Sequence, residues 1–249
     1  MGTLYIVGTP IGNLEDISTR ALHVLRKAHL IASENPSRTQ RLLARYNIST
    51  PMKRYTDAYH RKKKQRMAAV LAALGEGDVA LVSEAGMPGL ADPGYELIAA
   101  ALEQDTPVVS VPGPTALGTA LSVAGIPAER FIFLGFLPRT RNTRRDLLAP
   151  LVDNPFALVA YEAPHRLLDT LSDLEELFGK RSIAVACELT KLYEEIQWGT
   201  AAELLRHFQE HRPRGEFTLV IAGAQPPNLP PAPVLNRVEG DRVDNRGAT

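Results

Sequence analysis

Short apolar runs alternate with longer amphipathic runs along most of the chain. The apolar runs are rich in Val, Ile, Leu, Phe and Tyr and have the length of buried strands. We predict strands at 4–7, 30–33, 79–83, 107–111, 131–134, 156–161, 183–187 and 217–222. We predict helices at 19–27, 61–74, 95–103, 115–124, 144–151 and 166–178. Alternation of this kind predicts an α/β fold whose helices cover largely parallel sheets.

Proline and glycine divide the chain. Pro112, Gly113 and Pro114 follow a predicted strand and restrict the backbone, so we place a domain boundary there. The predicted units are an N-terminal α/β domain, 1–112, and a C-terminal α/β domain, 113–224. Residues 225–249 are rich in proline and poor in apolar residues, which predicts a disordered tail.

Composition narrows the class of protein. The 249 residues are 45% hydrophobic and 22% charged, as in an ordinary globular protein, and 28 basic residues balance 28 acidic ones. Binding to nucleic acid must therefore come from local patches. A single cysteine and six scattered histidines predict neither a disulfide nor a metal site. The start of the chain resembles neither a signal peptide nor a membrane span, so we expect a cytoplasmic protein.

Two basic clusters stand out from the neutral average. Residues 53–66 and 139–146 together hold 11 of the 28 basic residues and 2 of the 28 acidic ones. A solvated helix face is one interpretation; contact with RNA phosphates, with tyrosines stacking on bases, is the other. The RNA-binding candidates are Arg61, Lys62, Lys63, Lys64, Arg141, Arg144 and Arg145.

Loops that follow the predicted strands are the second source of candidates, because ligands of open parallel sheets bind at the carboxyl ends of the strands. The loop at 8–13 and the loop at 83–95 consist largely of Gly, Pro and small residues. Neither matches a dinucleotide-binding or phosphate-binding glycine motif. They are either tight surface turns or the backbone lining of a pocket, in which Glu84 would receive hydroxyl or amino groups.

Several motifs occur in a familiar order. They are the segment from Leu4 to Asp16, the segment from Ser83 to Tyr95, Val111 to Pro114, Gly135 to Pro138, Tyr161 to Arg166, Glu188 to Lys191, and Gly215 with Glu216. In this order the chain resembles the tetrapyrrole-methylase superfamily over about residues 3–223. Within it the motifs are most similar to the small-subunit ribosomal RNA ribose 2′-O-methyltransferases, which modify a cytidine of the decoding centre.

The resemblance implies two α/β domains, S-adenosylmethionine bound in the cleft between them, and a homodimer. Small residues and backbone groups suit a bent adenosine ligand. By motif, the implied cofactor-binding residues are Pro10, Ala85, Gly86, Leu90, Thr115, Ala116, Tyr161, Leu189, Thr190, Phe217 and Thr218. The implied partner is small-subunit ribosomal RNA or the assembled subunit.

Departures from the family pattern gather in one region. Relatives usually read Ala-Glu-Asp-Thr-Arg-x-Thr after the second strand, whereas this chain has Asn35 in place of the aspartate and its arginine one place later, at Arg38. Glu84 stands where aspartate is commoner, and Asp57 to Arg61 departs from the usual Tyr-His-Glu-His-Asn. These changes concern substrate contacts more than cofactor binding.

Methyl transfer to a ribose hydroxyl requires alignment, exclusion of water and a base for the hydroxyl proton. Unranked catalytic candidates are Glu34, His60, Glu188 and Lys191, of which the lysine would need a lowered pKa. Two alternatives remain open. One is methylation of a tetrapyrrole ring carbon, against which the motifs at 161–166 and 188–191 weigh, and the other is a non-catalytic RNA-binding assembly factor.

Overall fold

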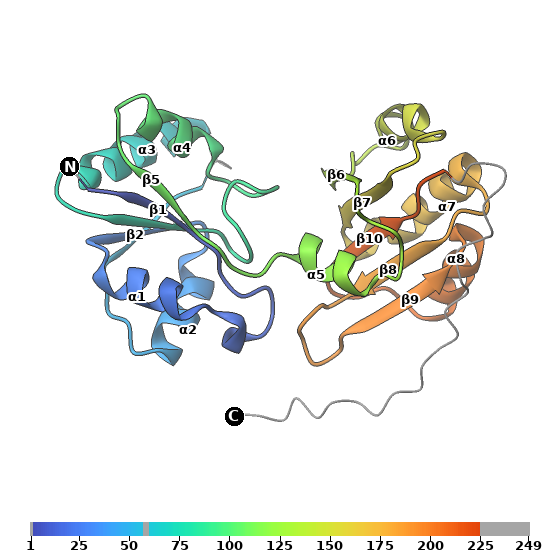
Figure 1. Ribbon diagram of the computed structural model, residues 1–249, viewed down its shortest axis with the longest axis horizontal. Coiled ribbons are helices and arrows are strands. Elements are labelled where there is room, and N and C mark those ends of the chain that lie inside the picture. The colour runs from blue at the N-terminus through green and yellow to red at the C-terminus, as the bar shows by residue number, and fades with distance from the viewer. Residues whose placement is uncertain (1, 57–59, 225–249) are drawn as a thin grey trace. The chain divides into compact units, whose positions relative to one another are not determined.

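The computed structural model describes residues 2–56 and 60–224, except for the side chains of residues 60–62. It divides into two compact units, Met1–Ala116 and Leu117–Thr249, shown in Figure 1. The division lies four residues beyond the predicted boundary because the Pro-Gly-Pro segment packs on the first unit: a Cβ built on Gly113 would lie 2.8 Å from the Cα of Gly8. The predicted tail, 225–249, lies outside the described residues.

The first unit contains a five-stranded sheet in the order β3-β2-β4-β1-β5. Its strands are β1 (Leu4–Val7), β2 (Leu30–Ser33), β3 (Met52–Arg54), β4 (Val79–Val82) and β5 (Val108–Val111). All four strand pairings are parallel, as the alternating pattern predicted.

Helices cover both faces of this sheet. They are α1 (Thr19–Lys27), α2 (Pro36–Arg45), α3 (His60–Leu74) and α4 (Tyr95–Leu102), with a short 3-10 turn at Leu14–Asp16 before α1. Leu25 of α1 and Leu42 of α2 belong to one buried cluster, whereas Leu74 of α3 and Leu97 of α4 belong to another. Thus α1 and α2 lie on one face and α3 and α4 on the other.

Two elements of the first unit, α2 and β3, were absent from the sequence prediction. The α2 sequence is polar apart from Leu42, Leu43 and Ala44, so its apolar face is short. Its start is nevertheless well specified, because the side chain of Asn35 accepts a hydrogen bond from the backbone nitrogen of Arg38 at 3.3 Å and Pro36 occupies the first turn. The capping signal was present, whereas the hydrophobic periodicity was too weak.

The second unit contains a mixed sheet in the order β6-β7-β10-β8-β9. Its strands are β6 (Phe131–Phe136), β7 (Ala157–Glu162), β8 (Ile183–Cys187), β9 (Glu195–Gly199) and β10 (Phe217–Ile221). Among the described strands of this sheet, β6 and β7 pair in parallel and the other three pairings are antiparallel. The seven residues between β8 and β9 are too few for a crossover helix, so these strands form a hairpin. Over both sheets five of eight pairings are parallel, which confirms the predicted two-domain α/β class with mostly parallel pairing.

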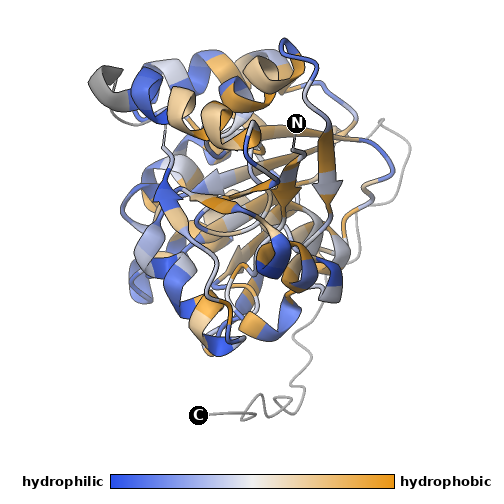
Figure 2. Ribbon diagram, turned by 90° about the vertical axis from the view of Figure 1, so that its left-hand side faces the viewer, coloured by the Kyte–Doolittle hydropathy of each residue, from blue (hydrophilic) through white to orange (hydrophobic). Residues whose placement is uncertain are grey.

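Helices of the second unit are α5 (Ala116–Val123), α6 (Arg141–Leu148), α7 (Leu167–Phe178) and α8 (Ala201–Glu210), with 3-10 turns at Ala149–Leu151 and Pro164–Arg166. One buried cluster joins Leu148 of α6, Leu171 of α7 and Phe208 of α8 to sheet residues such as Leu219. Thus α6, α7 and α8 share one face of the sheet. Figure 2, in which the first unit faces the viewer, shows apolar colour along the strands of a sheet.

Candidate functional site

The carboxyl ends of β1, β2 and β4 carry the candidate residues of the first unit. The chain leaves β1 and β2 toward α1 and α2 on one face, and leaves β4 toward α4 on the other. Because β4 lies between β2 and β1, its loop diverges from both neighbouring loops. Such a switch point is where open α/β sheets bind ligands.

Backbone contacts fix the loops that follow β1 and β4. Thr9 and Gly86 exchange two hydrogen bonds, with the Thr9 nitrogen 2.9 Å from the Gly86 oxygen and the Gly86 nitrogen 3.0 Å from the Thr9 oxygen. Gly86 has φ 76°, in the left-handed region that favours glycine. The cofactor-binding candidates of this unit lie on these loops and on the segment after β5: Pro10, Ala85, Gly86, Leu90, Thr115 and Ala116.

A polar cluster joins the ends of β2 and β4. The Glu84 carboxylate accepts a hydrogen bond from the Asn35 amide at 3.1 Å and pairs with Arg38 Nε at 3.0 Å. Glu34 accepts a hydrogen bond from the Glu84 backbone nitrogen at 2.9 Å. The residues that depart from the family pattern thus contact one another. Sequence reasoning did not assign a role to Arg38 or Asn35, and the order in which strands pair brings them to Glu84.

In the second unit, Lys191 is held between two carboxylates. Its Nζ lies 2.7 Å from Glu188 and 3.0 Å from Glu216. Burial by itself would lower the pKa of Lys191, but the hydrogen bonds to both carboxylates outweigh it and raise that pKa. Lys191 is therefore an ammonium group at neutral pH, which removes it from the candidates for a general base.

The backbone around Lys191 is strained. Glu188 has φ 50° and Thr190 has φ 66°, which few residues other than glycine adopt. Gly215 lies against Glu188, since a Cβ built on Gly215 would lie 2.3 Å from its side chain. Strained backbone gathers at functional sites, and this segment carries two cofactor-binding candidates, Leu189 and Thr190. Phe217 and Thr218 begin the neighbouring strand β10, and both are buried.

Tyr161, the remaining cofactor-binding candidate, packs against aromatic rings of β6. Its ring centroid lies 5.0 Å from that of Phe133 and 5.4 Å from that of Phe136, both in edge-to-face geometry. Its hydroxyl accepts a hydrogen bond from the backbone nitrogen of Leu117 at 3.1 Å. Both contacts restrict the Tyr161 side chain to one orientation.

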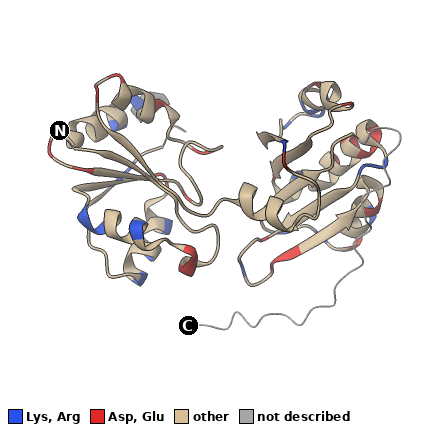
Figure 3. Cartoon of the chain, viewed as in Figure 1, with Lys and Arg blue, Asp and Glu red and all other residues tan. Residues whose placement is uncertain are grey.

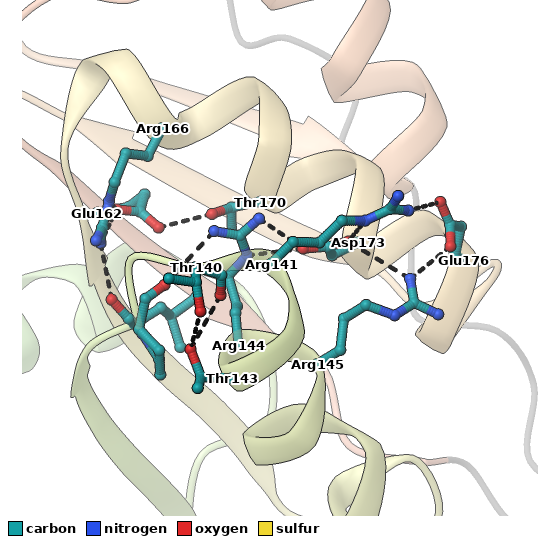
Figure 4. A network of polar contacts seen from close by, with 12 residues as sticks. Thr140, Arg141, Thr143, Arg144, Arg145, Glu162, Arg166, Thr170, Asp173 and Glu176 are labelled. Atoms are coloured by element: carbon teal, nitrogen blue, oxygen red, sulfur yellow. Dashed lines mark hydrogen bonds and ion pairs between the residues drawn. The ribbon is translucent and has the colours of Figure 1, made fainter.

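The rest of the motif from Tyr161 to Arg166 is structural. The buried Glu162 carboxylate accepts hydrogen bonds from Arg166 Nε and Thr170 Oγ1, both at 2.6 Å. Arg166 also donates to the Leu137 carbonyl at 2.9 Å. These contacts, drawn in Figure 4, tie the segment after β6 to the start of α7. The sequence analysis assigned no role to this pair, although Arg166 follows Glu162 by four residues, because the spacing alone does not show that the carboxylate is buried.

The basic cluster of α6 is largely neutralised within its own unit. Arg144 is buried, with its Nη2 2.6 Å from Asp173, and Arg141 and Arg145 pair with Asp173 and Glu176 of α7, as Figure 4 shows. Burial alone would raise the pKa of Asp173, but hydrogen bonds from Arg141 and Arg144 hold it below its usual range. Arg144 therefore holds α6 on α7, and we withdraw it from the RNA-contacting candidates.

The other basic cluster is only partly described. Lys63 pairs with Glu96 of α4, and Lys64 is exposed. The side chains of His60, Arg61 and Lys62 lie outside the described residues. Within 2–56 and 60–224 no group of His, Cys, Asp and Glu forms a metal-binding cluster, and no helix there has the length and apolarity to cross a membrane.

Known proteins match the chain across both units. The family model of Tetrapyrrole (Corrin/Porphyrin) Methylases matches residues 3–205. A Thermotoga maritima protein named Ribosomal RNA small subunit methyltransferase I is 46% identical over 226 residues, 90% of this chain and 100% of that protein. Proteins with the same name from Synechocystis and Pseudomonas aeruginosa are 46% and 43% identical, covering 92% and 91% of this chain and 82% and 80% of their own lengths.

Solved structures with the same fold are more distant in sequence. The cobalt precorrin-4 methyltransferase CbiF has a TM-score of 0.65 at 16% identity, over 88% of this chain and 94% of that one. Uroporphyrin-III C-methyltransferase from Thermus thermophilus, in a complex with S-adenosylhomocysteine, has a TM-score of 0.59 at 20% identity, over 88% and 97%. At these identities the likeness shows the fold alone.

Proposed function

Since the chain belongs to the tetrapyrrole methylase family, it is a methyltransferase, and we propose that it transfers a methyl group from S-adenosylmethionine to small-subunit ribosomal RNA. The main support for this proposal is the 43–46% sequence identity, over 90–92% of the chain, to the three methyltransferases named above. The finer proposal, that the acceptor is a ribose 2′-hydroxyl of a decoding-centre cytidine, rests on the motif resemblance.

The residues present fit the cofactor. The loops after β1 and β4 offer backbone groups with little side-chain bulk, and a Cβ built on Gly86 would meet nothing closer than Ile11 Cγ2 at 3.6 Å. Hydroxyls of Thr115, Thr190 and Thr218 are donors and acceptors suited to an adenosine and an amino acid moiety. When bound, S-adenosylmethionine supplies an electrophilic methyl group. The chain has to orient the acceptor oxygen and exclude water.

We propose Glu34 as the group that takes the hydroxyl proton. It follows β2 at the switch point, and its carboxylate is oriented by the Glu84 backbone nitrogen at 2.9 Å. Lys191 is protonated, and Glu188 is engaged by Lys191 and by the Glu216 backbone nitrogen at 2.9 Å. Glu188 and Lys191 are therefore positioning residues that hold the strained segment 188–190 in place.

The tetrapyrrole alternative has weaker support. The solved structures reported above whose names give tetrapyrrole substrates are only 16–20% identical to this chain, whereas the relatives named as ribosomal RNA methyltransferases are 43–46% identical. A ribosomal substrate also implies a cytoplasmic protein, and the family resemblance supports a homodimer. Light scattering of the purified chain will measure its oligomeric state.

The test uses small ribosomal subunits from a strain that lacks the modification, incubated with the protein and methyl-labelled S-adenosylmethionine. Mass spectrometry of nuclease digests then locates the label. We expect label on a 2′-O-methylcytidine fragment. Cofactor binding without labelled RNA would overturn the proposal and favour a different acceptor or a non-catalytic role.

A further inference from the structure

The surface formed by α1, α2 and β3 is strongly basic, although its cations are too dispersed to form a run. Residues 17–56 contain eight Lys and Arg and one acid, Glu34. Neither α1 nor α2 carries Asp or Glu, and Figure 3 shows blue segments along both helices. All eight cations are exposed: Arg20, Arg26, Lys27, Arg38, Arg41, Arg45, Lys53 and Arg54.

Helix geometry aligns the cations of α2. Buried Thr39, Leu42 and Leu43 face the sheet, whereas Arg38, Arg41 and Arg45, at spacings of three and four residues, share one exposed stripe. This stripe runs about 10 Å along the helix. Its first member, Arg38, lies at the carboxyl edge of the sheet, where it pairs with Glu84 beside Glu34. The stripe therefore leads along α2 to the proposed reacting end.

Local contacts join α1 and α2 into one surface. Arg26 donates to the Tyr46 carbonyl just after α2 at 3.1 Å, and the Tyr46 hydroxyl donates to the Leu14 carbonyl just before α1 at 2.8 Å. Both helices contribute to the same buried cluster. In the described part of the chain, Arg38 is the one cation of this surface that pairs with an acidic side chain. The eight cations still outnumber the acids when exposed Glu15 and Asp16 of the 3-10 turn before α1 are counted with Glu34, and seven of them have no acidic partner of the kind that neutralises α6 in the described residues.

The chemistry of this surface favours a phosphate backbone over a protein or lipid partner. Six of the eight cations are arginines, whose planar fork matches phosphate geometry. Between residues 17 and 56 no large hydrophobic side chain is exposed, whereas protein interfaces and membrane-bound helices present apolar side chains at their centres.

We propose that the α1–α2–β3 surface docks the phosphate backbone of the substrate RNA and leads the acceptor nucleotide to the carboxyl edge of β2 and β4. This inference rests on the proposed function, because the proposed function identifies the RNA. Of the two basic clusters in the sequence analysis, 53–66 and 139–146, this surface shares only Lys53 and Arg54, and it includes none of the RNA-binding candidates named there.

The test compares two triple variants with equal loss of charge. Lys27→Gln, Arg41→Gln and Arg45→Gln remove three exposed cations of the surface and leave Arg38 and its partners intact. The control is Lys180→Gln, Arg206→Gln and Arg212→Gln, three exposed cations of the second unit. Affinity for small-subunit RNA is measured from low to high potassium chloride, with S-adenosylmethionine binding and thermal unfolding as checks.

We expect the first variant to reduce the slope of log affinity against log salt by roughly 2 to 3, at about 0.7–0.9 per lost phosphate contact. The slope of the control variant should stay within about 0.5 of the wild-type slope. Equal slopes in both variants, or an unchanged slope in the first, would overturn the proposal. Unchanged binding of free RNA with lost activity on assembled subunits would also overturn it, in favour of a ribosomal protein partner.

The same experiment separates this inference from the proposed function. If the wild-type protein binds RNA with the expected salt dependence but transfers no methyl group to it, the proposed function fails while the docking surface stands. If the wild type methylates RNA and the first variant matches the control, the docking surface fails while the function stands.

Discussion

Arg144 and Asp173 form a buried ion pair. Substituting one of them should lower the free energy of unfolding by a different amount than substituting the other. Both side chains are at most 3% exposed, and their closest atoms are 2.6 Å apart. Arg144 has a single acidic partner in the described structure, whereas Asp173 also pairs with Arg141 and Arg145. The aspartate therefore keeps cations nearby when Arg144 is lost, but the arginine has no other carboxylate when Asp173 is lost.

These contacts set the expected magnitudes. Asp173→Val leaves an uncompensated buried guanidinium and should cost about 3–5 kcal/mol of unfolding free energy. Arg144→Met leaves Asp173 with its two half-exposed partners and should cost about 1–3 kcal/mol. The double variant replaces the pair by apolar side chains and should lie within about 1 kcal/mol of wild type, so the two single effects are strongly non-additive.

Urea unfolding followed by tryptophan fluorescence measures this cycle. Trp198, the single tryptophan of the chain, lies in β9 of the second unit, so its signal reports the unit that contains the pair. Additive single effects, or a smaller cost for Asp173→Val than for Arg144→Met, would refute the reasoning.

The pH dependence gives an independent check. The folded pKa of Asp173 lies below its unfolded value of about 3.9, so its contribution is present above that value and is lost as pH falls through the folded pKa. The stability difference between wild type and Asp173→Val should therefore shrink below about pH 4. A difference that stays constant from pH 6 to pH 3 would contradict the ion-pair account.

Three further predictions concern the proposed site. Glu34→Gln should lower kcat at least about a hundredfold with unchanged S-adenosylmethionine affinity, measured by single-turnover methyl transfer and calorimetry; an unchanged kcat would remove Glu34 as the base. Gly215→Ala should destabilise the second unit by about 1–3 kcal/mol in urea, because φ is 84° and the new Cβ would meet Glu188; alanine tolerated without cost would contradict the packing. Burial, with the nearby charges of Glu188 and Glu195, raises the pKa of Cys187 to about 11, so at pH 8 a thiol reagent should modify it roughly a hundredfold more slowly than an exposed cysteine; rapid modification would refute the assignment.

The sequence by itself determined the fold class and the position of most elements. Strands such as Leu4–Val7 and Ile183–Cys187 lie where their apolar runs predict them, because a fully buried strand needs a continuous apolar segment. It also located the glycine-rich loops, whose conformation depends on local backbone freedom, and its motifs pointed to the methylase family that the comparisons confirmed.

Only the tertiary structure decided how charges pair and how strands order. Arg144 and Asp173 are 29 residues apart in the chain, and Asn35 and Glu84 are 49 apart, so neither contact follows from local periodicity. From the sequence, the cations of α6 were interpreted as an RNA-binding patch, but in the structure acidic side chains of α7 neutralise them. The cations of α1 and α2 are dispersed in the sequence, but they form one surface because both helices pack on the same face of the sheet. Net charge depends on composition alone. The distribution of charge over the surface depends on which helix and strand faces are buried in the hydrophobic core and which are exposed.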